Sequence, residues 1–124
     1  MGVRSYRDLI VWRKATELAT EVYSVARNFP SSERFGLTSQ IQRAAVSVPS
    51  NIAEGQARRH SAEFRHYLHQ ALGSLAEVDT QLYLARELGY LERIDVTRTV
   101  SLIVELQKML HTLLARLPSG RSTQ

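Results

Sequence analysis

The residues with the clearest potential for metal chemistry are Glu63 and His66, in the stretch Glu63-Phe-Arg-His66. A glutamate three residues before a histidine is the spacing that di-iron helical bundles use, because both side chains then project from one helix face. Such a centre needs two of these motifs and further carboxylates, and the sequence contains the motif once. His69, one turn after His66, completes a pair that is typical of an exposed helix face. We therefore expect no metal ion to be bound.

Ser47 and Ser50 are the candidate nucleophiles, but no histidine lies at a recognisable spacing from either serine. The sequence also has no glycine-rich phosphate loop and no zinc metalloprotease pattern. It has no cysteine, so thiolate ligands and disulfides are excluded. The sequence thus predicts no catalytic residue, no cofactor and no small-molecule substrate, and we expect the protein not to be an enzyme.

Positive charge is the stronger chemical signal. The formal net charge is +4, from 16 basic and 12 acidic residues. Basic side chains cluster near the amino end and again at Arg58-Arg59-His60. Clustered cations bind phosphates without reading bases. The predicted nucleic-acid-binding residues are Arg7, Arg13, Lys14, Arg58 and Arg59. The alternative is that these side chains form a solvated charged rim.

Apolar residues recur at helical spacing in four segments, which predicts helices over about residues 7–28, 37–55, 61–88 and 94–117. Phe29-Pro30 ends the first segment, and Gly89 follows the third where a left-handed cap is expected. Ser61 is a plausible N-cap for the third segment. The positions expected in the core are Val11, Ala15, Leu18, Val22, Val25, Phe29, Leu37, Ile41, Ala45, Val48, Ile52, Gly55, Phe64, Leu68, Ala71, Leu75, Val78, Leu82, Ala85, Thr99, Ile103, Leu106, Leu110, Leu113 and Leu117.

Four such helices with short connections predict an all-α protein, an up-down-up-down antiparallel four-helix bundle. We expect one domain over residues 1–119 and a disordered polar tail at 120–124. In this topology the first helix starts where the second one ends, so the two basic clusters should share one end of the bundle. The apolar runs are too short for a membrane span, and no signal-peptide pattern is present, so we expect a cytoplasmic protein without a membrane partner.

The second helix carries two apolar arcs side by side, although one bundle usually buries a single face of each helix. Pro49 lies within it and should kink it, at a cost of about 3 kcal/mol. The Ser47 or Ser50 hydroxyl could satisfy the carbonyl that Pro49 frees. One hypothesis is that the second arc is a subunit interface, and the alternative is that Pro49 is a tolerated bend. The predicted interface residues are Arg43, Val46, Pro49, Ala53, Glu54 and Ala57.

Five stretches carry a family resemblance: Tyr6–Ala15, Phe29–Pro30, Leu37–Gly55, Gly73–Glu77 and Leu88–Leu91. Together they resemble the four-helix bundle proteins first met as products of intervening sequences in bacterial large-subunit ribosomal RNA genes. The resemblance covers the chain from Tyr6 to about Leu117. It implies a cytosolic, non-enzymatic bundle that assembles into a homo-oligomer, a pentameric ring. The similar accessory proteins of diversity-generating retroelements are basic pentamers that bind a reverse transcriptase and RNA.

The sequence leaves two main functions open, and a third, a bundle enzyme that uses His66 and Glu63, would require a bound metal ion. The first is a homo-oligomeric interaction module that binds RNA, or a ribonucleoprotein with a reverse-transcriptase-like protein, through its basic end. The second is a protein-only scaffold whose basic end is incidental. The residues alone do not fix the number of subunits or name the partner.

Overall fold

The computed structural model describes residues 6–118, and the four predicted segments are helices. These are α1 (Ile10–Ala26), α2 (Leu37–Arg58), α3 (Ser61–Glu87) and α4 (Thr97–Arg116). Short 3-10 helices, η1 (Tyr6–Asp8) and η2 (Ser31–Glu33), precede α1 and α2. Residues 6–118 contain no strand, which confirms the all-α prediction. The tail predicted at 120–124 lies outside the described residues.

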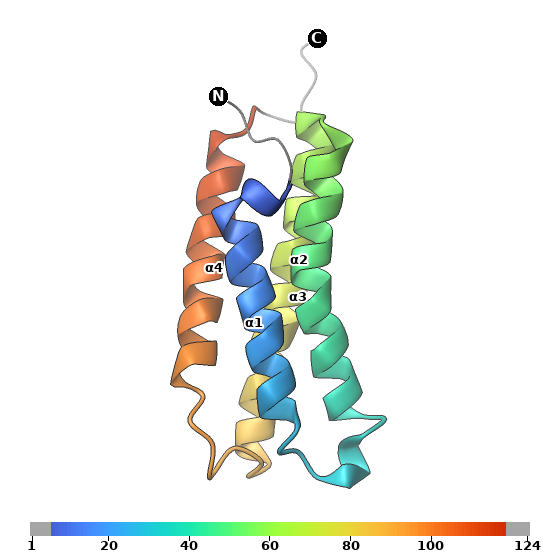
Figure 1. Ribbon diagram of the computed structural model, residues 1–124, viewed down its shortest axis with the longest axis vertical. Coiled ribbons are helices and arrows are strands. Elements are labelled where there is room, and N and C mark those ends of the chain that lie inside the picture. The colour runs from blue at the N-terminus through green and yellow to red at the C-terminus, as the bar shows by residue number, and fades with distance from the viewer. Residues whose placement is uncertain (1–5, 119–124) are drawn as a thin grey trace.

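The four helices lie side by side, and each runs opposite to the one before it (Figure 1). Each helix packs against two neighbours, in the order α4, α1, α2, α3 and back to α4. The α2–α3 pair packs most closely, and the α3–α4 pair packs most loosely. The start of α1 lies at the same end as the end of α2 (Figure 1), as the topology requires.

The core is formed by the predicted apolar stripes. The expected core positions are buried, with three exceptions on α3 and after it. The side chains of Phe64, Leu113 and Leu117 are half-buried. Leu18, Ile52, Leu75 and Leu106 are fully buried, one from each helix. Burying such a side chain contributes about 1.5–3 kcal/mol relative to leaving it in water. The helical period was therefore sufficient to find the core.

Two predicted helix starts were wrong, and local backbone explains both. Leu9 is extended (φ −79°, ψ 126°), which separates η1 from α1, so α1 begins at Ile10 instead of residue 7. The Asp95 carboxylate accepts a hydrogen bond from the Thr97 backbone N–H at 2.9 Å, so α4 begins at Thr97 instead of residue 94. Hydrogen bonding from the Thr97 side chain, and second from its backbone N–H, lowers the pKa of Asp95.

The connection before α3 differs from the prediction, whereas the connection after it agrees. Ser61 is the first residue of α3, and the N-cap position belongs to His60, whose side chain makes no capping hydrogen bond. At the other end Gly89 has φ +81°, the left-handed conformation expected there. Glycine adopts this conformation without the steric cost that a Cβ imposes.

The closest approach of α2 and α3 depends on the absence of a side chain at Gly55. A Cβ added there would lie 2.8 Å from Tyr67 Cβ and 2.9 Å from Phe64 Cδ1. Further along the same seam, Ser74 Oγ donates to Ser47 Oγ at 2.9 Å. Small and short polar side chains thus let the two helices pack at close range.

Pro49 is buried, and α2 continues through it. Its ring removes the amide that would bond the Ala45 carbonyl. Ser47 was expected to help by donating to a freed carbonyl, but its hydroxyl instead accepts hydrogen bonds from Asn51 Nδ2 and Ser74. Asn51 Nδ2 also donates to the Ser47 carbonyl at 2.8 Å. These side chains tie α2 to itself and to α3.

The two helical glycines should respond oppositely to alanine. Gly55→Ala should destabilise the fold by about 1–3 kcal/mol, because the new Cβ overlaps side chains of α3. Gly73→Ala should stabilise it by about 0.5–1 kcal/mol, because no atom lies within 4 Å of the added Cβ and alanine is the better helix former. Urea unfolding of both variants measures the difference. A loss of stability in Gly73→Ala, or none in Gly55→Ala, would contradict this packing.

Glu33 joins the loop before α2 to the loop after α3. Its Oε1 accepts from the Leu37 N–H at 2.9 Å, and its Oε2 accepts from the Tyr90 hydroxyl at 2.8 Å. A Cβ at Gly36 would lie 2.8 Å from Oε1, so glycine leaves room for the carboxylate. The two hydrogen bonds, that from Leu37 first, lower the pKa of Glu33 below its ordinary value of 4.5. They favour its charged form.

A lowered pKa in the folded state makes Glu33 stabilising at neutral pH, and this contribution is lost as the pH falls through that pKa. Above about pH 6 the melting temperature of Glu33→Gln should therefore lie below that of the wild type by a constant difference. This difference should disappear below about pH 4. Tyr90→Phe removes one hydrogen-bond donor to Glu33, so the melting temperature of this variant should depend less on pH than that of the wild type. Thermal melts across this range test both variants, and a difference that persists unchanged in acid would contradict the assignment.

Candidate nucleic-acid interface

The five predicted nucleic-acid-binding residues lie toward one end of the bundle. Arg7, Arg13 and Lys14 belong to η1 and the first turns of α1, and Arg58 and Arg59 end α2. η1 packs against both α1 and α2, which places the two clusters on adjoining elements (Figure 1). The prediction that the clusters share one end is therefore confirmed.

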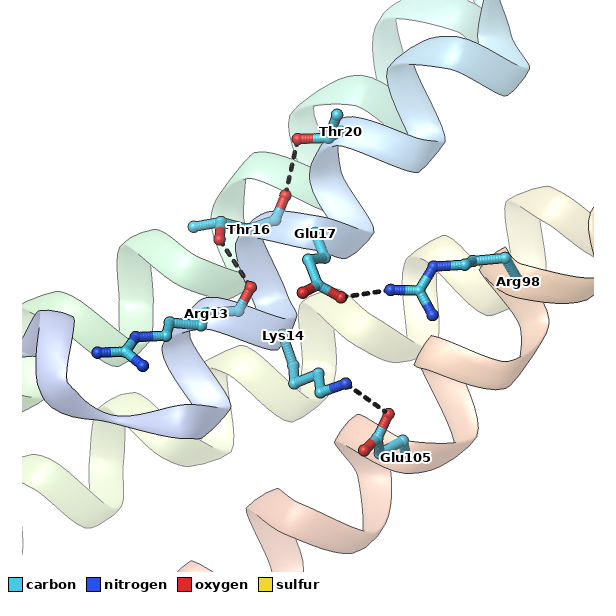
Figure 2. A network of polar contacts seen from close by, with 7 residues as sticks. All are labelled: Arg13, Lys14, Thr16, Glu17, Thr20, Arg98 and Glu105. Atoms are coloured by element: carbon cyan, nitrogen blue, oxygen red, sulfur yellow. Dashed lines mark hydrogen bonds and ion pairs between the residues drawn. The ribbon is translucent and has the colours of Figure 1, made fainter.

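Lys14 and Arg58 are paired with carboxylates inside the protein. Lys14 Nζ lies 3.6 Å from Glu105 Oε1 across the α1–α4 seam (Figure 2). Arg58 donates twice to Glu54 Oε2, from Nε at 3.0 Å and Nη2 at 2.7 Å, and its guanidinium lies over the Tyr67 ring. The Glu54 hydrogen bond raises the pKa of Arg58. Both charges are partly neutralised, which weakens them as phosphate ligands.

Of the other three, Arg13 and Arg59 are exposed and have no carboxylate partner within residues 6–118, so they keep more of their charge for a ligand. Arg13 Nε donates to the Arg7 carbonyl at 3.1 Å, a neutral partner, and the Arg7 guanidinium lies 6.0 Å from the centre of the Tyr6 ring. Arg59 has φ +65°, the left-handed conformation that non-glycine residues rarely adopt. Within residues 6–118, Arg59 has no hydrogen-bond or ion-pair partner. It is the most available of the five.

The structure adds cations that the sequence analysis missed. Because α3 starts and α4 ends at the same end of the bundle, Arg65, Lys108 and Arg116 join the predicted cations there (Figure 1). We call residues 6–13, 48–73 and 106–118 the basic half. All four histidines of the chain, at positions 60, 66, 69 and 111, lie in this half. These cations could have been found from the sequence. Because successive helices alternate in direction, basic residues that are far apart along the chain lie at the same end of the bundle.

Charge is strongly segregated along the bundle. The basic half has seven cations and three acids, a net charge of +4, with the Lys14–Glu105 pair left out because its two charges cancel. The acidic half, residues 15–47 and 74–104, has six arginines and eight acids, a net charge of −2. A polyanion is therefore attracted to one half and repelled by the other.

The predicted subunit interface is only partly on the surface. Val46 is 43% exposed, Arg43 and Ala57 are exposed, and Ala53 is half-buried on the outer side of α2. Pro49 is buried within the protomer, because α2 packs against α1 and η1 as well as against α3. Pro49 therefore offers little surface to a second subunit, and the interface stays a prediction. The position of Glu54 is set by its pairing with Arg58.

Several exposed apolar side chains were not predicted. Phe35 is 89% exposed in the loop before α2, and Tyr83 and Leu88 are exposed near the end of α3. On α4, Val100 and Val104 are exposed four residues apart, so they lie on one helix face. This spacing was visible in the sequence, but the stronger core stripe of the same segment obscured it.

The α1–α4 seam is closed by surface ion pairs. Besides Lys14–Glu105, Arg98 Nη2 donates to Glu17 Oε1 at 2.6 Å, and Figure 2 shows both pairs between the two helices. Exposed pairs of this kind contribute about 0–1 kcal/mol each. They align the two helices more than they stabilise them.

Neither Glu63 nor His66 takes part in a metal-binding arrangement. The part of the chain that the structure describes contains no group of three histidine or acidic side chains that could hold a metal ion. The His66 ring packs edge-on against Tyr67, with ring centroids 5.0 Å apart.

No helix between residues 6 and 118 is long and apolar enough to cross a bilayer.

The fold and the charge distribution define a class, that of all-α four-helix proteins with one cationic end. Comparison with known families is more specific. The sequence matches the 23S rRNA-intervening sequence protein family over residues 7–112, and the chain belongs to that family. The resemblance seen in the sequence is thereby confirmed. No curated protein matches the chain.

Proposed function

We propose that the protein is a non-enzymatic, homo-oligomeric interaction module that binds RNA through its basic half. The observation that carries the proposal is the segregation of charge, +4 in one half and −2 in the other. Cations gathered on one surface release counterions when they neutralise phosphates, and this release drives binding without base recognition. Membership of a family defined by ribosomal RNA genes supports an RNA partner.

The cations best suited to phosphate are those without an internal carboxylate partner. Arg59 is the C-cap residue of α2, Lys108 lies just past the middle of α4, and Arg116 is the last residue of that helix. All three are exposed. Because Lys14 and Arg58 must first leave Glu105 and Glu54, we assign them a smaller share of the binding energy.

Removing two unpartnered cations should weaken RNA binding and its salt dependence. Arg59→Gln with Arg116→Gln should lower the slope of log affinity against log salt by about 2, since each lost phosphate contact removes about 1. Arg27→Gln with Arg93→Gln makes the same change of net charge in the acidic half and should leave the slope nearly unchanged. Fluorescence anisotropy with a structured RNA across a salt series measures both.

The outcomes separate the two functions left open by the sequence. If both double variants lose RNA affinity equally, net charge alone governs binding. The basic half is then not the RNA-binding surface. No RNA binding by the wild type near physiological salt would leave the protein-only scaffold. That second function is supported by the exposed Phe35, Tyr83 and Leu88 in the acidic half, which could dock a protein.

The homo-oligomer, with five subunits as the family resemblance implies, is proposed to form through the outer side of α2. Val46→Glu should lower the mass measured by light scattering, because a charge would be buried at the subunit contact. Val104→Glu is the matched control on α4, since Val46 is 43% and Val104 is 45% exposed. Both variants should stay helical. Loss of assembly in Val104→Glu alone would move the interface to α4, and a monomeric wild type would end the proposal.

A further inference from the structure

The seam between α3 and α4 opens into a groove of about 510 Å³ at the inner border of the basic half. Leu72 and Ala76 of α3 line one wall, and Gln107, Lys108 and His111 of α4 line the other. Each pair of residues four apart lies on one face of its helix, so the groove runs along the helix axes. Its lining is mainly apolar, with polar groups on the α4 side.

The groove exists because of how α4 is held. Near the end of α4, Arg65 Nη1 of α3 donates to the Leu114 carbonyl at 2.7 Å and ties the two helices together. As a whole the α3–α4 pair packs most loosely of the four seams, and the small side chain of Ala76 leaves space between the two helices. Leu72 is half-buried and Ala76 is exposed, so apolar surface faces solvent there.

The lining combines three kinds of group. Leu72 and Ala76 offer a surface on which a flat, weakly polar ring can rest. The Gln107 amide can donate and accept, which suits the edge of a nucleobase. The Lys108 side chain has no hydrogen-bond or ion-pair partner within residues 6–118, and with His111 it can take a neighbouring anion. An apolar surface adds nothing to the binding of phosphate alone.

We propose that this groove binds an unpaired nucleobase of single-stranded RNA, with Lys108 and His111 on the adjoining phosphate. The inference rests on the proposed function, because the net charge of +4 brings the polyanion to this half. A duplex keeps its bases stacked inside the helix and presents only phosphates and groove edges. Single strands are therefore bound by both the cations and the groove, and duplexes by the cations alone.

The test compares a short unstructured single-stranded RNA with a short RNA duplex. Ala76→Phe fills the groove from an exposed position without changing charge, and Ala115→Phe places the same side chain on an exposed α4 position outside the groove. Ala76→Phe should weaken single-strand binding about tenfold, the scale of one lost base contact, and change duplex binding less than about twofold. Ala115→Phe should change neither affinity.

Gln107→Leu keeps the size of the side chain but removes its hydrogen bonds, and it gives an independent reading should Ala76→Phe fold poorly. It should also weaken single-strand binding selectively. Ultraviolet crosslinking of the bound single strand, followed by peptide mass spectrometry, should label residues 72–76 and 107–111.

Each outcome decides one question. If the groove variants weaken both RNAs equally, or neither, the groove is no base subsite, although the basic half still binds RNA. Crosslinks that fall only elsewhere in the basic half have the same meaning. If the wild type binds neither RNA, the proposed function fails together with this inference.

Discussion

The close approach of α2 to α3 at Gly55 is the constraint on which the rest of the bundle depends. No side chain could stand between Gly55 and the Phe64 and Tyr67 side chains without displacing them. The Ser47–Ser74 hydrogen bond fixes the same seam further along. With α2 and α3 held this closely, α4 is joined to α3 by the Arg65–Leu114 hydrogen bond and to α1 by surface ion pairs. The loosest seam lies between α3 and α4, and the groove lies along it.

Helix direction turns scattered charges into a pattern. Along the chain, basic and acidic residues alternate without long runs, and only the up-down arrangement adds the ends of α2 and α4 to the starts of α1 and α3 (Figure 1). Cations at a helix C-terminus are favoured by the helix dipole, which suits Arg58 and Arg116 in their last turns. At the start of α3, Arg65 instead reaches the last carbonyls of α4. Local helix electrostatics and global charge segregation therefore agree at this end.

The fold was predictable because the apolar period survives in all four segments, and buried leucines such as Leu18 and Leu75 follow it directly. Helix starts were less predictable, since they depend on single backbone conformations such as that of Leu9. The Arg58–Glu54 pair, four residues apart on one helix, was within reach of the sequence. The Lys14–Glu105 pair was not, because it joins residues that only the tertiary fold brings together. Pro49 was assigned to a subunit interface because a helical wheel shows two arcs but does not show that η1 also covers α2.

The two kinds of contact in the basic half act over different distances. Net charge is felt over roughly the Debye length, about 8 Å at physiological ionic strength, so it captures any polyanion and orients it toward that half. The lining of the α3–α4 groove acts only in contact, because apolar burial and hydrogen bonds need direct approach. Internal pairing of Lys14 and Arg58 reduces the long-range attraction but leaves Lys108 beside the groove. Under the proposed function, discrimination between RNAs therefore falls to the groove, since every RNA presents the same phosphates to the cations.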